Sequence, residues 1–252
     1  MSIKDGGEWL KLSISIWDDS KTKEEKKFKH PASFPISIAS KLIRIYTEPG
    51  DTILDPFVGI GSTILAAAQL NRKSIGFEIN KDYINIIKKR LINFDNDLYM
   101  IFNQSSLDID KFLHEEQIDF CITSPPYWNI LNRKRTADNK SIINYGNNKD
   151  DLSNITDYEL FLSKIHIIFK KIHKLMKPNK HCVIIIQDIR KKSNFYPYHI
   201  DITKMMVNIG YSLEDYIIWD RKKEYNNLKP LGYPYVFRVN KVHEYISIFK
   251  KV

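Results

Sequence analysis

The 252-residue chain contains only two cysteines, Cys121 and Cys182, and each lies within an apolar run rather than in a CxxC or Cys–His pattern. This scarcity argues against a disulfide framework and against a structural metal site, and it favours a reducing compartment. No apolar run approaches the roughly 18 residues of a membrane span, and the amino-terminal MSIKDGGEW lacks the features of a signal peptide. We therefore expect a cytoplasmic protein without bound metal.

Acidic residues are outnumbered by basic ones. The 30 Asp and Glu residues against 39 Lys and Arg give a net charge of +9. This excess favours a polyanionic partner, nucleic acid first and an anionic membrane second. A chain of this length can bury one sizeable core, so we expect a single domain over residues 30–252. Residues 1–29 are expected to form a polar, basic N-terminal arm, and the charge run from Lys21 to His30 a solvated face.

Hydrophobic periodicity and turn residues divide the chain into alternating strands and helices. Strands are expected near residues 52–55, 73–78, 98–102, 118–122, 181–187, 216–219 and 244–249. Helices are expected near residues 35–47, 64–70, 80–91, 156–177 and 201–208. This alternation is typical of a doubly wound α/β fold, in which the last two strands would close the sheet as an antiparallel pair. We expect a seven-stranded, mostly parallel sheet.

A glycine-bearing loop, Asp-Pro-Phe-Val-Gly-Ile-Gly-Ser-Thr (residues 55–63), follows the first of these strands. Gly59 and Gly61 would let the backbone approach a bound group closely. The spacing matches neither the Walker pattern nor the three-glycine dinucleotide fingerprint, so a nucleoside without a phosphate chain is the expected ligand. Glu78 ends the next strand, where an acidic residue binds ribose hydroxyls in nucleotide-binding α/β folds.

A second loop, Thr-Ser-Pro-Pro-Tyr-Trp (residues 123–128), ends a buried strand. Pro125 and Pro126 have no N–H group, so the strand cannot continue beyond Ser124. Each proline also holds the preceding residue in an extended conformation, which exposes the oxygens of the turn. With the aromatic pair Tyr127 and Trp128 on the same rim, the turn suits a planar ligand that carries an exocyclic amino group.

These loops, together with His-Pro-Ala-Ser-Phe-Pro (residues 30–35) and Gly-Phe-Glu (residues 76–78), resemble the amino-group DNA methyltransferases. Members of that family methylate N4 of cytosine or N6 of adenine with S-adenosylmethionine. The resemblance covers residues 30–128 by motif and implies a Rossmann-like methyltransferase fold, S-adenosylmethionine as cofactor and duplex DNA with a flipped base as partner. It also raises a cognate restriction endonuclease as a candidate partner. The cofactor motif precedes the Pro-Pro-Tyr motif here, a permuted order relative to the commonest group with an HPA-x-FP segment.

The resemblance also implies which residues form the site. The cofactor side would comprise Phe34, Asp55, Pro56, Phe57, Gly59, Gly61, Ser62 and Thr63, with Glu78 on the ribose. For the adenine edge, residues 103–108 offer Gln104, Ser105 or Asp108, and Ser105 is the one we include. The target base would be received, and catalysis carried, by Ser124, Pro125, Pro126 and Tyr127.

The expected chemistry follows from the weak nucleophilicity of the amino nitrogen, whose lone pair is delocalised into the ring. Hydrogen bonds from its N–H groups to Ser124 Oγ and the Pro125 carbonyl would direct that lone pair toward the sulfonium methyl group. Within the family, serine before Pro-Pro is more usual for cytosine N4, which is therefore the expected acceptor. The alternatives, in order, are adenine N6, an amino group in RNA, and a non-catalytic DNA-binding subunit.

A polar stretch, residues 129–155, follows the second loop and contains the basic cluster Arg133-Lys134-Arg135. A long stretch without periodicity is usually functional or disordered. Beside the Pro-Pro-Tyr motif we expect it to contact DNA; a surface insertion is the alternative.

Overall fold

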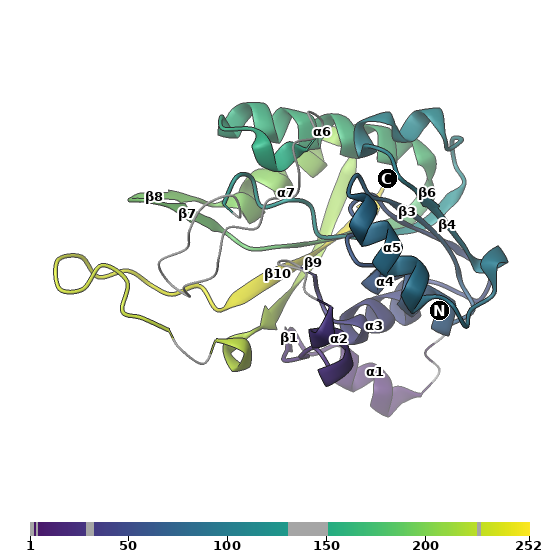
Figure 1. Cartoon of the computed structure of the whole chain (residues 1–252), viewed down its shortest axis with the longest axis horizontal. Helices are drawn as coiled ribbons and strands as arrows, with labels where there is room; N and C mark the ends of the chain where they lie inside the picture. The colour runs from purple at the N-terminus through teal and green to yellow at the C-terminus, as the bar shows by residue number, and fades with distance from the viewer. Residues whose placement is uncertain (1–2, 4, 29–32, 131–150, 226–227) are drawn as a thin grey trace.

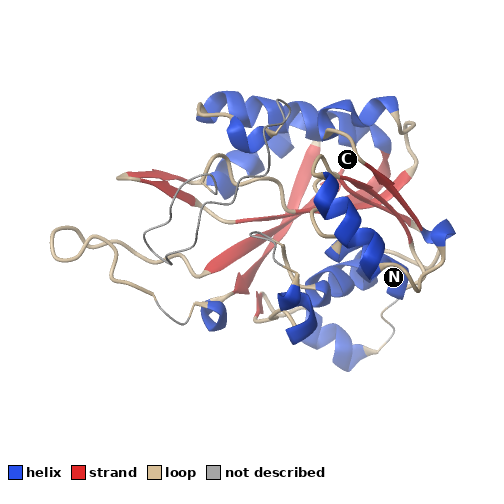
Figure 2. Ribbon diagram, viewed as in Figure 1, coloured by secondary structure: helices blue, strands red, loops and turns tan. Residues whose placement is uncertain are grey.

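The computed structural model describes residues 3, 5–28, 33–130, 151–225 and 228–252. Across these residues an eight-stranded sheet lies between two layers of helices (Figure 1, Figure 2). The strands run β1-β9-β10-β6-β5-β2-β3-β4 across the sheet. Their bounds are β1 Ile16–Trp17, β2 Thr52–Asp55, β3 Lys73–Phe77, β4 Tyr99–Phe102, β5 Ile118–Thr123, β6 Met176–Ile186, β9 Tyr211–Asp220 and β10 His243–Lys251.

The sheet is mostly parallel, as expected, and β10 is its antiparallel strand. β10 runs antiparallel to both of its neighbours, β6 and β9. The strand count is eight rather than seven, because β1 pairs with β9 at the sheet edge, with Trp17 opposite Trp219. A strand of two residues has no periodicity that a sequence could reveal, which is why it was missed.

The N-terminal residues described contain two short helices as well as β1. Helix α1 spans Gly6–Leu12, and α2 spans Lys23–Lys27 behind a capping box between Thr22 and Glu25. The Glu25 side chain is buried and accepts a hydrogen bond from Ile36 N at 2.7 Å. The charge run that begins at Lys21 is therefore packed at Glu25 against the start of α3 (Ile36–Tyr46) rather than fully solvated. Our division of the chain at residue 30 stays a prediction, since residues 29–32 lie outside the described part.

Helices cover both faces of the sheet (Figure 1). One face packs against α3 (Ile36–Tyr46) and α4 (Ser62–Gln69), with α5 (Lys81–Arg90) against α4; the other packs against α6 (Tyr158–Leu175) and α7 (Tyr198–Ile209). Strand β5 is buried throughout: Phe120 and Ile122 pack with α3, and Cys121 packs with α6. A strand buried on both faces reads as a continuous apolar run, which is the pattern that predicted it.

Two element boundaries differ from expectation. Helix α6 begins at Tyr158 rather than near residue 156, because Asp157 caps it: the Asp157 side chain accepts from Leu160 N at 2.7 Å. Strand β6 begins at Met176, directly after α6, because Met176 pairs with Ile118 of the parallel strand β5. Lys177 also forms an ion pair with the buried Asp119 of β5, at 2.8 Å. A short hairpin of β7 (Ile189–Lys191) and β8 (Asn194–Tyr196), not expected from the sequence, follows β6.

Strands β2 and β5 are parallel neighbours although they are far apart in sequence, with Leu54 opposite Cys121. From β2 the chain continues outward to β3 and β4, and from β5 it continues in the other direction to β6. The point where the winding reverses is where doubly wound sheets bind ligands, outside the carboxyl ends of the strands. Asp55 and Thr123 end the two strands there. None of the helices in the described part of the chain is long and apolar enough to cross a membrane.

Gly61 offers a test of the loop that begins α4. Its φ of +84° is left-handed, and a Cβ atom there would lie 3.0 Å from Ile87 Cγ1. We expect Gly61→Ala to lower the free energy of unfolding by about 1–2 kcal/mol, the strain of an L-residue in that conformation. The matched control is Gly6→Ala in α1, where an added Cβ meets nothing within 4 Å. Urea unfolding in which both variants behave alike would contradict the assignment.

Candidate active site

A pocket opens at the carboxyl ends of β2, β3 and β5. All of the predicted site residues except Gly61 and Thr63 line it, namely Phe34, Asp55, Pro56, Phe57, Gly59, Ser62, Glu78, Ser105, Ser124, Pro125, Pro126 and Tyr127. The glycine-bearing loop and the Pro-Pro-Tyr turn therefore face one cavity. The predicted segment His30–Ala32 and most of the predicted loop, residues 131–150, lie outside the described residues.

The two exceptions lie behind the pocket wall. Gly61 precedes the first turn of α4, packed against Ile87. Thr63 is fully buried in α4, and its hydroxyl donates to Asp55 Oδ2 at 2.6 Å. Both residues shape the pocket through their neighbours rather than by contact with its interior.

Asp55 joins the two loops. Its Oδ1 accepts hydrogen bonds from the Thr123 hydroxyl at 2.6 Å and from Phe57 N at 3.1 Å, while Oδ2 accepts from Thr63. The side chain is only 1% exposed. A buried carboxylate is tolerated where such donors surround it, so this one fixes the end of β5 against the start of α4. Burial raises the pKa of Asp55 to about 6, against the lowering effect of these hydrogen bonds.

Glu78 connects the glycine-bearing loop to the end of β3. Its Oε2 accepts from Gly59 N at 2.9 Å, and its Oε1 accepts from Asn80 N at 2.8 Å. Asn103 Nδ2 donates to the Glu78 carbonyl at 2.8 Å and so anchors the backbone. Burial raises the pKa of Glu78 to about 7, opposed by the two backbone hydrogen bonds. Each carboxylate oxygen keeps lone pairs that can accept hydroxyl groups of a ligand.

The Pro-Pro-Tyr turn is held from the far end of the chain. The Tyr127 hydroxyl donates to Glu244 Oε2 in β10 at 2.9 Å and lies 3.4 Å from Ser124 Oγ. Burial, and then the Glu244 charge, raise the pKa of Tyr127 well above its usual value. This tyrosine is therefore a neutral hydroxyl with a fixed orientation.

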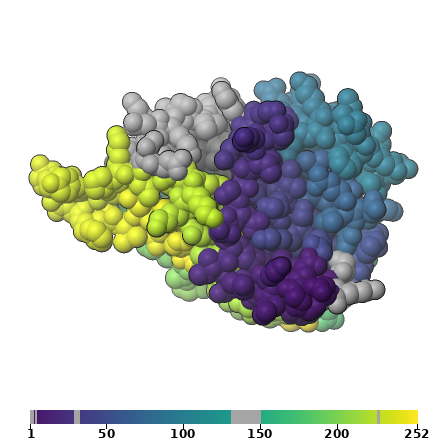
Figure 3. All heavy atoms as spheres, turned by 90° about the horizontal axis from the view of Figure 1, so that it is seen from below, coloured from purple at the N-terminus to yellow at the C-terminus, as the bar shows by residue number. Residues whose placement is uncertain are grey.

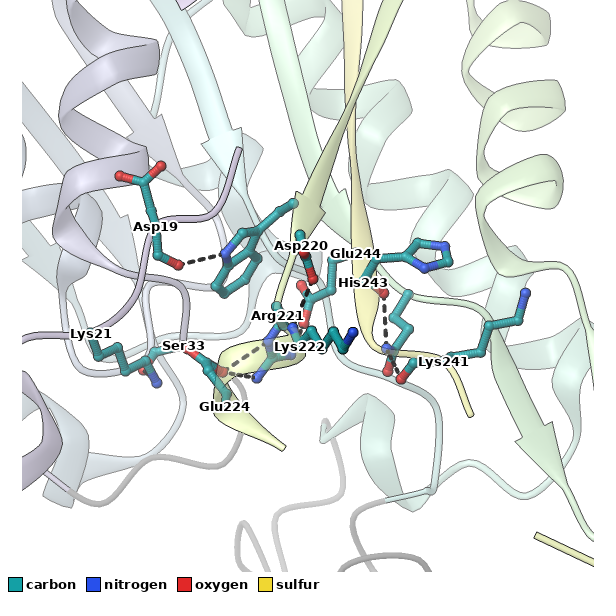
Figure 4. A network of polar contacts seen from close by, with 12 residues as sticks. Asp19, Lys21, Ser33, Asp220, Arg221, Lys222, Glu224, Lys241, His243 and Glu244 are labelled. Atoms are coloured by element: carbon teal, nitrogen blue, oxygen red, sulfur yellow. Dashed lines mark hydrogen bonds and ion pairs between the residues drawn. The ribbon is translucent and has the colours of Figure 1, made fainter. Parts of the chain in front are cut away.

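Glu244 is in turn paired with Arg221, which follows β9. Figure 4 shows the Arg221 guanidinium between Glu244 and Glu224, and its Nη2 lies 2.8 Å from Glu224 Oε2. The guanidinium also lies over the Trp219 ring, 4.7 Å from its centroid. A planar, permanently charged group with two carboxylate partners gives Glu244 a defined position. Nothing in the sequence around Glu244 pointed to this role.

A lysine from the N-terminal residues reaches the same region (Figure 4). Lys21 Nζ donates to Ser33 Oγ at 2.8 Å, and Ser33 lines the pocket. Burial lowers the pKa of Lys21 to about 8, with the Glu224 charge acting in the opposite direction. A cation thus lies behind the pocket wall.

Several lining residues were not predicted. Ser106 donates from Oγ to the Pro56 carbonyl, and Asp151, Leu152 and Ser153, which follow residues 131–150 in the sequence, also line the pocket. Trp128 was expected on an open rim, but it is buried, with Lys191 Nζ 3.4 Å from its ring centroid. Its ring also packs edge-on against Tyr158 and Tyr196, so Trp128 lines the pocket with little exposed surface, and Tyr127 is the more accessible aromatic residue of the turn.

The raised pKa of Asp55 gives a pH test. A carboxyl whose pKa is higher in the folded state stabilises the fold below its unfolded value, 3.8, and loses this contribution as the pH rises through about 6. The difference corresponds to about 3 kcal/mol. Urea unfolding between those pH values should show wild-type stability declining by up to that amount relative to Asp55→Asn, which cannot titrate. Parallel pH profiles for the two proteins would show that Asp55 has an ordinary pKa.

Comparison of the sequence with known proteins finds one family model and several methyltransferases that agree with it. A family model described as DNA methylase matches residues 4–89 and 118–252, most of the chain. The chain is 45% identical over 78 residues to the type II methyltransferase M2.LlaDCHI of Lactococcus lactis subsp. cremoris, covering 30% of this chain and 29% of that protein. It is 44% identical over 88 residues to the orphan methyltransferase M.BamHII of Bacillus amyloliquefaciens, covering 33% of each. The matches thus span about a third or less of these relatives.

Solved structures share the fold. TrmN from Thermus thermophilus superposes with a TM-score of 0.55 at 12% identity, over 88% of this chain and 50% of that one. A SAM-dependent methyltransferase from Methanosarcina mazei gives 0.54 at 12% identity, over 84% of this chain and 97% of that one. At these identities the similarity is one of architecture.

Proposed function

Because the chain belongs to the DNA methylase family, we propose that it transfers a methyl group from S-adenosylmethionine to the exocyclic amino group of a base flipped out of duplex DNA, with cytosine N4 as the acceptor. One observation carries the proposal. The glycine-bearing loop and the Pro-Pro-Tyr turn line a single pocket and are joined through Asp55. A methyl donor and an acceptor base need such a shared site.

The cofactor side fits a nucleoside. No side chain caps the amino end of α4, and Gly59 and Ser62 line the pocket beside it. Glu78 offers carboxylate lone pairs to ribose hydroxyls, and Phe34 and Phe57 offer apolar surface. Ser105 lines the same pocket and remains our candidate for the adenine edge. When bound, the cofactor supplies an electrophilic methyl group on a sulfonium centre.

The hydrogen-bond directions around Tyr127 prepare Ser124 to accept. Tyr127 has one hydroxyl hydrogen, and it is directed at Glu244, a carboxylate paired with Arg221. The Ser124 hydroxyl can therefore act only as donor to the Tyr127 oxygen, 3.4 Å away. Both lone pairs of Ser124 Oγ then remain for an amino N–H of the base. The Pro125 carbonyl can take the second N–H.

Holding both N–H groups in this way turns the amino lone pair out of conjugation and toward the methyl group. Rate enhancement would come from positioning and from charge complementarity, without a covalent intermediate on the protein. The Tyr127 ring would stack on the flipped base and offset part of the few kcal/mol of unstacking. The C–S bond electrons would stay on the departing sulfur, and the methylated amino group would lose one proton to solvent or to an acceptor in the site.

The choice of cytosine N4 rests on the serine before Pro-Pro, which within the family is more usual for that acceptor. The relatives' designation as type II supports a cognate restriction endonuclease as a cellular partner, and we include it in the proposal. The orphan designation of another relative marks the alternative, a methyltransferase that acts alone.

Substitutions in the turn test the roles of its residues. We expect Ser124→Ala and Tyr127→Ala to lower turnover by about 100-fold or more, because an acceptor and a stacking ring are lost where the reacting group is held. Tyr127→Phe keeps the ring and should lose about tenfold, the order of one hydrogen bond. The affinity for S-adenosylmethionine, measured by calorimetry, should not change. Tyr99→Phe in β4 is the control, since its hydroxyl bonds only to Asn96 Oδ1, at 2.6 Å, among the described contacts. An equal loss of cofactor affinity in the turn variants would contradict these roles.

The acceptor atom has a direct test. DNA from cells that express the chain should contain N4-methylcytosine when its nucleosides are separated and weighed by mass spectrometry. DNA from cells that express Ser124→Ala at the same level is the control. N6-methyladenine in the DNA would identify adenine N6 as the acceptor. Methylated nucleosides in RNA alone would identify RNA as the substrate. If neither DNA nor RNA is methylated in cells that contain the chain in soluble form, the proposal that it is an enzyme would be contradicted.

A further inference from the structure

Residues 228–242, which connect β9 to β10, project from the body of the molecule (Figure 1, Figure 3). We call them the aromatic finger. Its tip is a closed turn in which Tyr235 N and Val236 N both donate to the Gly232 carbonyl at 2.8 Å. Asn240 Nδ2 donates to the Lys229 carbonyl at 3.1 Å and joins the two legs. The finger therefore has internal structure.

The finger leaves large apolar side chains in solvent. Tyr233 is 79% exposed, Tyr235 90% and Phe237 93%. Val236 and Val239 are also more than half exposed. Three aromatic rings gathered on one projection are unusual for a surface without a partner. Aromatic residues of this kind commonly provide the contact area of an interface.

The charge of the finger is of one sign. Its sequence LKPLGYPYVFRVNKV contains Lys229, Arg238 and Lys241 and no acidic residue. Arg238 Nη1 donates to the Lys192 carbonyl at 2.9 Å, which joins the finger to the β7–β8 hairpin. That hairpin adds three consecutive cations, residues 190–192. The buried Asp188 lies 4.0 Å from Lys241 and offsets part of this charge. The finger and the hairpin together form a positively charged surface.

This surface adjoins the pocket. Arg221 N donates to the Val242 carbonyl at 2.8 Å at the base of the finger, and Glu244 follows two residues later. These are the residues that hold Tyr127. On the hairpin side, Lys191 lies over Trp128, which lines the pocket. Whatever binds the finger and the hairpin therefore lies beside the Pro-Pro-Tyr turn.

We propose that the aromatic finger, with the β7–β8 hairpin, is the surface that docks duplex DNA beside the target base. Tyr233, Tyr235 and Phe237 contact bases and sugars, and Lys229 and Arg238 contact phosphates. The inference rests on the proposed function. A second copy of the chain fits less well, because two fingers of like charge repel each other while a polyanion neutralises both the finger and the hairpin.

The aromatic part is tested with the triple variant Tyr233→Ser, Tyr235→Ser, Phe237→Ser. Fluorescence anisotropy with a short mixed-sequence duplex should give a Kd at least tenfold higher than that of the wild type. The affinity for S-adenosylmethionine should be the same. Leu10→Ser with Ile92→Ser is the matched control, since these side chains are 68% and 79% exposed but lie in α1 and in the turn after α5. The control should bind the duplex as the wild type does.

The charged part is tested by salt dependence. The double variant Lys229→Gln, Arg238→Gln removes two charges. Its slope of log Kd against log salt, between about 50 and 200 mM, should be shallower than that of the wild type by about 2, the value for two lost phosphate contacts. The aromatic variant should keep the wild-type slope. Lys88→Gln with Lys89→Gln, exposed on α5, is the control with the same change in charge and should also keep it.

Duplex binding by both finger variants with wild-type affinity and slope would overturn the inference. A second result would also overturn it: sedimentation shows a dimer for the wild type and a monomer for the aromatic variant, while the two proteins bind the duplex equally well. The finger would then bind a second copy of the chain. Transfer of labelled methyl groups to plasmid DNA separates this inference from the proposed function. If the wild type transfers no methyl group but the finger variants still bind the duplex more weakly than it does, the proposed function would be contradicted. The assignment of the docking surface would then still hold.

Discussion

The site depends on one buried carboxylate, Asp55, and on the two threonine hydroxyls and one backbone N–H that donate to it. Asp55 ends β2, Thr63 belongs to α4 and Thr123 ends β5, so three elements meet at a single side chain. Because Asp55 is only 1% exposed, leaving its carboxylate with too few donors would be costly, which makes this arrangement hard to disrupt. Because the strand ends are locked together there, the loops that follow them cannot diverge. The glycine-bearing loop and the Pro-Pro-Tyr turn face one pocket for that reason.

A second constraint comes from the closing strands. Tyr127 is oriented by Glu244 of β10, which is positioned by Arg221 after β9. The antiparallel pair thus does more than complete the sheet, since its end supports the turn that would receive a base. Because the phenolic hydrogen is directed away from Ser124, the serine is left as a hydrogen-bond acceptor. The function of one hydroxyl therefore depends on an ion pair from a distant part of the sequence.

The sequence predicted the features whose signals are local. The mostly parallel sheet followed from apolar runs and helix periodicity, and the two loops followed from glycine and proline. Glu244 and Lys21 were not predicted as parts of the site, because each meets its partner only through the fold; Tyr127 and Glu244 are 117 positions apart. Strand β1 was too short to have a period, and Trp128 was misjudged because its burial depends on Tyr158, Tyr196 and Lys191. Thr63 was predicted as a site residue from its motif, but its role as a hydrogen-bond donor to Asp55 was not predicted.

The contact between β2 and β5 has a consequence for the order of the motifs. The two loops meet through side chains at adjacent strand ends, and the connection between them runs through β3 and β4 at one flank of the sheet. Cutting the chain in that connection and joining it elsewhere would leave the same atoms facing each other. The arrangement is thus indifferent to circular permutation, and a chain in which the cofactor motif comes first can build the same cleft as one in which it comes last.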